Sequence, residues 1–243
     1  MSLSLKVINS SSKKPNRGQN HLDIRASCAD NRVSTHSSPK HIVRGLLEGL
    51  TADFCKKGGR FMPYIPILPP DKASEEVNAV YEEFYRRMSF PSAPNFITTQ
   101  GHSDTVVRGT WEAVKGALVT GVLPRWQKEM MFVAISKDRE CRYCTAAHIA
   151  CCRMLGVKPE LLESLVRDVN HIPDPKLRDM VKFALKCSRD PQTLTETDYE
   201  LLRQHGLNQS EIMEIIAMSA FAVYANIIAD ATAMEADQMF DTI

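Results

Sequence analysis

Apolar residues recur at helical spacing in nearly every segment from residue 62 onward, and this periodicity constrains the fold more than any other feature of the chain. The first such segment places these residues on one helical face: Val77, Val80, Tyr81, Phe84 and Met88. The alternation with a period of two residues that is typical of a half-buried strand does not occur in the sequence. The chain is therefore predicted to be all-α.

Capping and helix-breaking residues divide this region into successive helices. Ser103 can cap a helix that reaches about Val119, and Pro124 suits the first turn of the next helix. Thr197-x-x-Glu200 and Asn208-x-x-Glu211 are capping-box patterns, each expected to open a helix. The helices before these two are predicted over residues 74–88, 103–119, 124–136, 141–156, 159–168 and 176–189.

The first 61 residues differ in composition from the rest. They carry 11 Lys/Arg and 4 Asp/Glu, whereas residues 62–243 carry the other 19 and 25. Because the segment is basic and Ser-rich, we expect a disordered extension over 1–61 and one all-helical domain over 62–243. A short amphipathic helix is predicted within the extension, over 41–55. The extension suits a targeting segment, a basic tail or a dispensable segment upstream of Met62.

The overall composition excludes several classes of function. A net charge of +1 gives no reason to expect nucleic acid or an anionic membrane as a partner. The longest apolar run, around Ile212 to Ile228, is interrupted by Glu214 and Asn226, so no membrane span is expected. The seven cysteines are odd in number and unevenly spread, which argues against a secreted disulfide framework. We expect a cytoplasmic protein.

Residues 140–152, ECRYCTAAHIACC, hold four of the seven cysteines and one histidine. On a helix, Cys141 and Cys144 have β-carbons about 5–6 Å apart on one face. His148 lies one turn further along the same face. A neighbouring imidazole and the N-terminal dipole of a helix that starts at Cys141 both favour a thiolate. The spacing indicates a reactive dithiol.

Glu129 is the fourth candidate residue. It lies twelve residues before Cys141, and the polar KDRE turn separates the two, so we expect it on the preceding helix. From there its carboxylate could orient His148 or relay a proton. Arg125 and Lys128 precede it by four and one residues and are interpreted as charges on a solvated face.

Haem, zinc and simple packing are alternative explanations of the cysteine cluster. A c-type haem site needs histidine directly after the second cysteine, and CTAAH does not provide it. Ligands spread from Cys141 to Cys152 would extend over about 15 Å of one helix, too far for one tetrahedral zinc ion. Zinc bound by Cys144, His148 and distant ligands stays open. Packing is the interpretation favoured for the remaining cysteines, Cys28, Cys55, Cys151, Cys152 and Cys187.

The spacing Glu129-x11-Cys141-x2-Cys144-x3-His148 resembles the E-x11-C-x2-C-x3-H pattern of the alkylhydroperoxidase D-like proteins in the carboxymuconolactone decarboxylase superfamily. The segment that begins MPYIPILPPDKASEEV is similar to the opening of the peroxidase-related branch. The segment LTETDYELLRQHGLNQSEIMEIIAMSAFAVYANIIADA is similar to its closing helices. The resemblance covers about residues 62–238.

This resemblance implies an all-helical, homo-oligomeric thiol peroxidase without a metal or an organic cofactor. Cys144 would be the peroxidatic thiol, activated by a proton relay through His148 and Glu129. Cys141 would resolve the sulfenic acid to a redox-active Cys141–Cys144 disulfide. The implied partners are a hydroperoxide substrate and a dithiol electron donor, such as a lipoyl protein.

Tyr143 departs from the best-studied branch, which has histidine before the second cysteine. A tyrosine can donate a hydrogen bond but is a poor base at neutral pH, so its assistance to Cys141 is an open point. The C-terminal helix would lie near the dithiol, and its polar residues Tyr224, Asn226 and Asp230 are interpreted as helix-face or oligomer contacts.

Two other functions remain compatible with the sequence. A decarboxylase of the carboxymuconolactone type would have the same fold but would not need the cysteine pair. A non-enzymatic redox sensor would use the same dithiol without repeated peroxide turnover.

Overall fold

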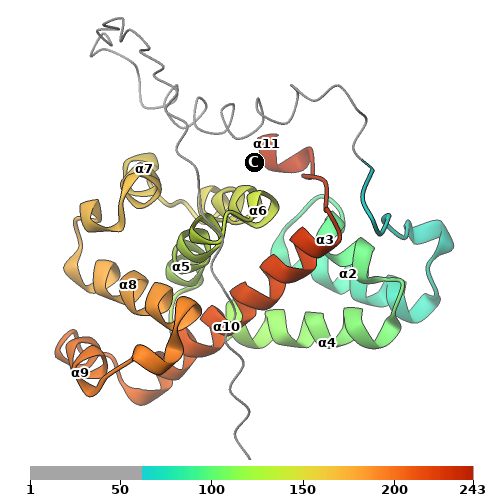
Figure 1. Ribbon diagram of the computed structural model, residues 1–243. Helices are drawn as coiled ribbons and strands as arrows, with labels where there is room; N and C mark the ends of the chain where they lie inside the picture. The colour runs from blue at the N-terminus through green and yellow to red at the C-terminus, as the bar shows by residue number, and fades with distance from the viewer. Residues whose placement is uncertain (1–61, 243) are drawn as a thin grey trace, which may run out of the picture. The chain divides into compact units, whose positions relative to one another are not determined.

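The computed structural model describes residues 62–242, so the disorder predicted for 1–61 and the helix predicted over 41–55 lie outside the described residues. Within 62–242 every regular element is helical, which confirms the all-α prediction (Figure 1). The α-helices are α2 (Glu75–Met88), α3 (Asn95–Gln100), α4 (Asp104–Val114), α5 (Arg125–Asp138), α6 (Arg142–Met154), α7 (Pro159–Arg167), α8 (Pro175–Arg189), α9 (Glu196–Gln204), α10 (Gln209–Ala231) and α11 (Met239–Thr242). Short turns of other helix types lie between them: η1 (Pro70–Lys72), η2 (Lys115–Val119), η3 (Val169–His171) and η4 (Pro191–Thr193).

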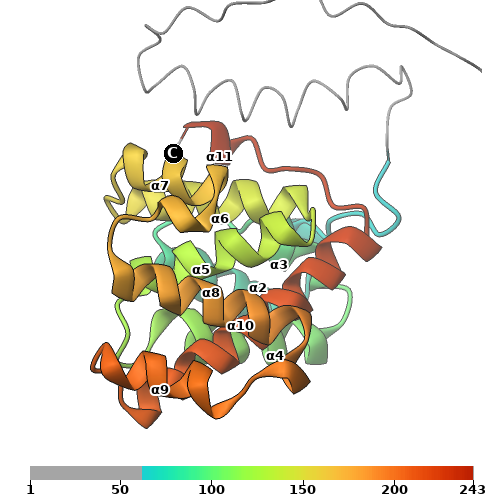
Figure 2. The same ribbon diagram turned by 60° about the vertical axis from the view of Figure 1, so that its left-hand side comes forward.

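Helix α5 forms the centre of this bundle. It packs against α6, α8 and α10, and the two ribbon views place it between α6 on one side and α8 and α10 on the other (Figures 1 and 2). An uninterrupted run, Lys128 to Ser136, is buried, so every face of the helix is covered over more than two turns. Such a helix has no solvent-facing stripe. Any polar side chain in that run is therefore held inside the protein.

Helix α10 is the longest element of the described region. Its 23 residues are long and apolar enough to cross a membrane by length and composition alone, contrary to the expectation from the sequence. Half of the apolar window is buried inside this fold. Glu214 pairs with Lys128, and Asn226 is buried against Ser136. These contacts account for the two polar interruptions within a packed bundle.

Several predicted helix boundaries are confirmed. Ser74 and Ser103 cap α2 and α4 through their side chains, and Asn208 and Glu211 form the capping box of α10. The helix predicted to reach Val119 ends as an α-helix at Val114 and continues as the π-helical turn η2.

Other boundary predictions were wrong. The capping box of α9 uses Thr195 and Asp198, whereas Thr197 lies inside that helix. The carboxylate of Asp198, at the third helical position, accepts from the backbone N–H of Thr195. The capping box therefore begins two residues before the predicted one. Pro124 precedes α5 with ψ of 134° and does not form its first turn. The short helices α3 and α11 were not predicted.

The KDRE segment joins α5 to α6 with almost no intervening loop. Glu140 adopts the left-handed conformation with φ of 59°, and the Cys141 N–H donates to the carbonyl of Ser136 at 2.9 Å. This is a Schellman arrangement, which satisfies a terminal carbonyl of the first helix. Cys141 then serves as the residue that precedes α6. The turn therefore fixes the dithiol against the end of the central helix.

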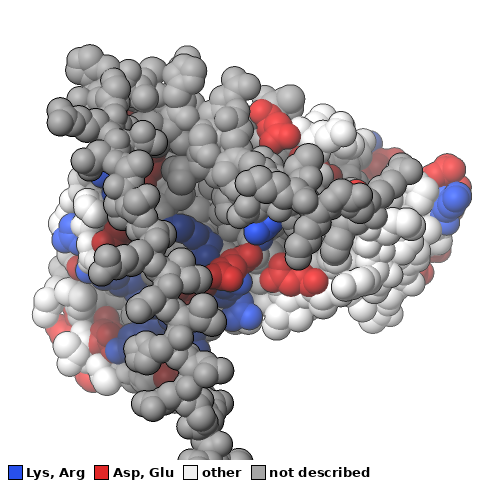
Figure 3. Space-filling view, turned by 45° about the horizontal axis from the view of Figure 1, so that its top comes forward, with Lys and Arg blue, Asp and Glu red and all other residues white. Residues whose placement is uncertain are grey.

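Charged side chains are mixed on the face that Figure 3 shows. Acidic and basic residues of the described region are interspersed there, without one large patch of a single sign (Figure 3). The prediction that nucleic acid is not a partner stays a prediction.

Candidate functional site

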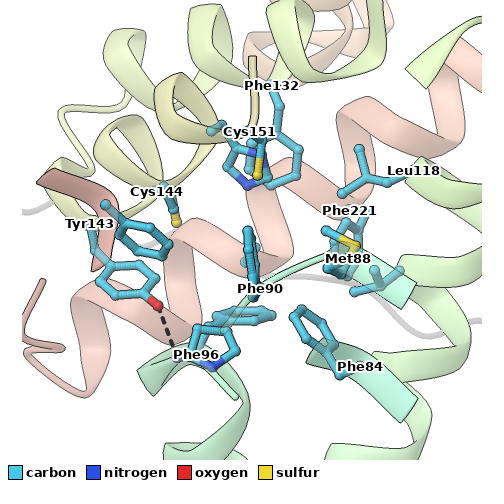
Figure 4. A pocket seen from close by; sticks show the side chains of 16 residues that line it. Phe84, Met88, Phe90, Phe96, Leu118, Phe132, Tyr143, Cys144, Cys151 and Phe221 are labelled. Atoms are coloured by element: carbon cyan, nitrogen blue, oxygen red, sulfur yellow. Dashed lines mark hydrogen bonds between the residues drawn. The ribbon is translucent and has the colours of Figure 1, made fainter. Parts of the chain in front are cut away.

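An apolar cavity of about 50 Å³ lies where α6 faces α2, α10 and the segment around Phe90 (Figure 4). Cys144 and Cys151 point from α6 toward its aromatic rings. The other side chains that line it are Phe84, Met88, Phe90, Pro94, Phe96, Val114, Leu118, Phe132, Tyr143, Ala147, His148, Phe221, Ala225 and Phe240. The polar groups of the lining are thus almost confined to α6.

The dithiol lies at the N-terminal end of α6. Cys141 precedes the helix and is fully buried, and Cys144 follows in the first turn at 2 % exposure. Both are free thiols. The Cys141 thiol lies 4.0 Å from the carbonyl oxygen of Asn226 on α10. A hydrogen bond with Cys144, followed by burial, raises the pKa of Cys141. Cys141 is therefore the protonated partner of the pair, and its thiol donates to the Asn226 carbonyl.

His148 is fixed on two sides. Its Nδ1 lies 2.5 Å from Oε2 of Glu129, which places the predicted carboxylate on α5 in direct contact with the imidazole of α6. Its ring stacks on Phe132, with ring centroids 3.5 Å apart and planes inclined by 19°. Hydrogen bond and stacking together set both the position and the plane of the imidazole. His148 also lines the cavity with Cys144.

Glu129 is completely buried and is neutralised by a residue predicted to be solvated. Arg125 Nε donates to Glu129 Oε1 at 3.0 Å, with the arginine side chain 19 % exposed. Burial alone would raise the pKa of Glu129, but His148 and Arg125 hold it below its ordinary value. The interpretation of Arg125 and Lys128 as a solvated face was wrong, because α5 is covered on all sides and Lys128 is also fully buried.

Cys151 is buried, as its predicted packing role requires, but it also belongs to the site. It lines the cavity, and its sulfur lies within 4.8 Å of ligand atoms of both Glu129 and His148. Burial and the Glu129 carboxylate raise its pKa well above the ordinary value, so this thiol stays protonated. Cys151 follows His148 by three residues, which places both side chains on one helical face. This spacing is the signal in the sequence that could have indicated Cys151 as part of the site.

Glu129, His148 and Cys151 are also donors of the kinds that bind zinc. Their existing contacts oppose a cation. One carboxylate oxygen already pairs with Arg125 and the other with His148 Nδ1, and the guanidinium adds a positive charge at the same place. The arrangement fits a proton relay better than a metal centre.

The Tyr143 hydroxyl makes its hydrogen bonds with groups other than Cys141. The hydroxyl donates to Oδ2 of Asp237 at 2.7 Å. It accepts from the Phe96 N–H at 3.0 Å (Figure 4). Burial, followed by the Asp237 carboxylate, raises the pKa of Tyr143 well above its usual range. This tyrosine therefore holds the C-terminal segment against α6 and stays protonated.

The polar residues of α10 have three different surroundings. Asn226 is buried, donates from Nδ2 to Ser136 and reaches the dithiol through its carbonyl. Tyr224 bonds to Thr110 and lies partly exposed. Asp230 is exposed. Asn226 is thus the one of these three that touches Cys141.

Comparison with known proteins identifies the fold. No known family model matches the chain, and no curated protein matches its sequence. Two solved peroxidase-related proteins are similar. One is an alkylhydroperoxidase AhpD core from Ralstonia eutropha JMP134, with a TM-score of 0.68, 25 % identity and coverage of 75 % of this chain and 96 % of that chain. The other is from Silicibacter sp. TM1040, with a TM-score of 0.66, 29 % identity and coverage of 75 % and 97 %.

A further structure, the debrominase Bmp8, is similar in fold alone, with a TM-score of 0.63 at 17 % identity and coverage of 73 % of this chain and 94 % of that chain. The similarity to all three structures thus extends over nearly their whole lengths. This chain has the alkylhydroperoxidase D-like fold of the carboxymuconolactone decarboxylase superfamily.

Proposed function

We propose that this protein is a thiol-dependent peroxidase that reduces hydroperoxides through a dithiol–disulfide cycle of Cys144 and Cys141. The observation that carries the proposal is the combination of a buried dithiol with a histidine–glutamate pair at one apolar cavity. A structural cysteine pair would not need a positioned base beside it. The names of the two peroxidase-related structures support the same class of chemistry.

The contacts favour Cys144 as the nucleophile. Cys144 lies in the first turn of α6, where the helix dipole stabilises a thiolate, and it lines the cavity, whereas Cys141 does not. Cys141 stays protonated because its pKa is raised by its hydrogen bond with Cys144 and by burial. His148 is the base that takes the Cys144 proton, and Glu129 holds its ring.

The reaction then follows from these assignments. The Cys144 thiolate attacks one peroxide oxygen, the O–O bond breaks, and the departing alkoxide takes the proton from His148 to leave as an alcohol. Cys144 is now a sulfenic acid. The Cys141 sulfur displaces its hydroxyl group as water, with the thiol proton going to that oxygen, and a disulfide forms. A dithiol donor returns the two electrons and restores both thiols.

The lining of the cavity favours organic hydroperoxides over hydrogen peroxide. Six phenylalanines line the cavity that Cys144 faces. They come from the segment between α2 and α3 and from helices α2, α3, α5, α10 and α11: Phe84, Phe90, Phe96, Phe132, Phe221 and Phe240. Desolvation of an apolar substituent against such rings contributes to binding, whereas hydrogen peroxide has no apolar surface to bury.

The direct test measures consumption of cumene hydroperoxide with dihydrolipoamide as donor. We expect turnover by the unchanged chain and none by Cys144→Ser. Cys141→Ser should consume one equivalent and accumulate a sulfenic acid that a dimedone probe labels. Cys187→Ser on α8, a cysteine outside the cavity, should keep full turnover.

Three results would contradict the proposal or replace it. Unchanged turnover in Cys144→Ser would exclude the assigned nucleophile. A single stoichiometric oxidation of the unchanged chain, without turnover with any dithiol tried, would favour a redox sensor. Lactone decarboxylation that survives replacement of both cysteines would favour the decarboxylase alternative.

A further inference from the structure

Arg125 occupies an unusual place for a charged side chain at the start of a helix. It lies in the first turn of α5, one turn before Glu129, and is mostly covered by the protein. Its Nε donates to Oε1 of a carboxylate that is completely buried. The other oxygen of that carboxylate faces Nδ1 of His148. Glu129 thus bridges Arg125 and the imidazole that we assign as the base.

This bridge decides where the imidazole proton sits. A carboxylate that already pairs with a guanidinium is a weaker base than an isolated buried carboxylate, because the positive charge favours its ionised form. The proton between Glu129 and His148 therefore stays on Nδ1. With Nδ1 donating, Nε2 holds the free lone pair. Phe132 fixes the ring plane by stacking, so the orientation of Nε2 is also fixed.

We propose that Arg125 is a positioning residue that keeps Glu129 ionised and His148 in the Nδ1–H tautomer, so that Nε2 is free to accept the proton of Cys144. The inference rests on the proposed function and extends it, since neither the sequence motif nor the relay of Glu129 and His148 includes an arginine. Cys144 lies one turn before His148 on α6 and lines the same cavity.

Among the residues that the structure describes, Arg125 is the positive charge in contact with this pair. The titratable groups that face Glu129 are His148, Cys151 and Cys152 on α6, together with Arg125 on its own helix. Both cysteine thiols have a raised pKa because they are buried, so they stay neutral and do not cancel the guanidinium. Helix α10 adds only apolar side chains to the cavity, Phe221 and Ala225.

The experiment follows thiolate formation at Cys144 directly. The reduced full chain is treated with iodoacetamide at a series of pH values, and labelling of Cys144 is quantified by peptide mass spectrometry. Loss of one positive charge makes nearby groups hold their protons more tightly. For Arg125→Gln we expect half-maximal labelling to move up by about one pH unit, which is about a tenfold lower rate at a fixed pH on the acidic side.

Two variants separate charge from packing. Arg125→Lys keeps the charge at the same place and should restore the profile to within about a third of that shift. Arg203→Gln removes one positive charge from α9, a helix that adds no residue to the cavity, and should leave the profile in place. If Arg125→Gln does not fold, the lysine variant still tests the proposal, because a role of the guanidinium in packing alone predicts a shifted profile there.

Several outcomes would overturn the inference. These are an Arg125→Gln profile that coincides with that of the unchanged chain, a lysine variant shifted as far as a neutral one, and a Cys144 that no pH makes reactive. The labelling experiment needs no peroxide. A chain that labels as expected but reduces no hydroperoxide would therefore exclude the proposed function while supporting the role of Arg125.

Discussion

At the scale of single residues, buried charges on α5 distinguish this site from an ordinary helix core. Lys128 is fully buried and pairs with Glu214 at 2.8 Å, and it also donates to the carbonyl of Thr120. Glu214 in turn accepts from the backbone N–H groups of Val122 and Leu123. This network ties the connection between α4 and α5 to the long helix α10. It also fixes the first turns of α5, which carry Arg125.

Removal of one partner from this network should be costly. Lys128→Met leaves Glu214 without its cation in a poorly solvated place, and we expect a loss of about 3–5 kcal/mol in the free energy of unfolding, measured in urea. The double variant Lys128→Met/Glu214→Gln should be more stable than Lys128→Met. Lys186→Met breaks an ion pair that is more exposed, with Asp198, and should cost less than about 1 kcal/mol. Equal losses at Lys128 and Lys186 would contradict this account.

The sequence was informative at this scale where chemistry depends on spacing within or next to one helix. The sequence could predict that four side chains converge: Glu129, Cys141, Cys144 and His148. The structure brings Glu129 and His148 into contact and places the two free thiols next to each other. The burial of Arg125 could not be predicted, because it depends on helices that pack around α5 from distant parts of the chain. A local pattern of charged residues cannot tell a covered helix face from a solvated one.

At the scale of elements, the C-terminal segment after α10 forms one wall of the cavity. The backbone N–H of Asn95 donates one bifurcated hydrogen bond to both carboxylate oxygens of Asp237, and the hydroxyl of Tyr143 donates to Oδ2. Phe240 lies against the rings of Phe90 and Tyr143. One carboxylate therefore joins the start of α3, the start of α6 and the end of the chain next to the dithiol.

Asp237 should make stability depend on pH in the opposite direction from a surface carboxylate in an ion pair. Burial raises its pKa above the ordinary 3.8, although Tyr143 and Asn95 oppose the shift. The folded protein then binds the proton more tightly than the unfolded chain. This contribution to stability is fully present below about pH 3.8 and is lost as the pH rises through the raised value.

The variant Asp237→Asn removes this dependence. Its free energy of unfolding relative to the unchanged chain should rise as the pH increases from about 4 through the raised pKa, measured by urea unfolding at several pH values. Asp241→Asn, which removes an exposed carboxylate from the same segment, controls for the loss of one charge. A relative stability of Asp237→Asn that falls with rising pH would contradict the sign.

Elements with strong periodicity were predicted well, and elements defined by tertiary contacts were not. The helices that correspond to α2, α6, α7 and α8 lie within a few residues of their predicted bounds, because apolar stripes and caps are local signals. Helices α3 and α11 have six and four residues, too few for a periodic stripe. The α9 capping box was displaced because two threonines offer similar patterns and only the fold selects between them.

At the scale of the whole molecule, α10 presents an apolar stripe to solvent. From Met213 to Ile227 no exposed residue of this helix is charged, and the stripe consists of Met213, Ala217, Ala220, Tyr224 and Ile227. The spacing of three and four residues keeps these side chains on one face. The opposite face packs into the core beside α5 and α8. An exposed stripe of this kind on the longest helix of the domain is typical of contact surfaces between subunits.

We propose that the protein forms homo-oligomers through this stripe. Ile227 is 54 % exposed, so Ile227→Glu should cost the isolated subunit little but would bury a charge in a subunit contact. Light scattering with size-exclusion chromatography should give a multiple of the subunit mass for the unchanged chain and a smaller mass for this variant. Leu201→Glu on α9, at 41 % exposure and outside the stripe, should leave the mass unchanged.

The outcome also bears on the site. Ala225 lines the cavity and Asn226 contacts Cys141 from the buried face of α10, directly before the exposed Ile227. A subunit contact on the stripe would therefore restrain the helix that covers the dithiol. If so, Ile227→Glu should speed iodoacetamide labelling of Cys144 as it lowers the mass. If the unchanged chain is monomeric at micromolar concentration, the stripe is not a subunit contact. The shape of the cavity would then depend on the fold of one chain alone.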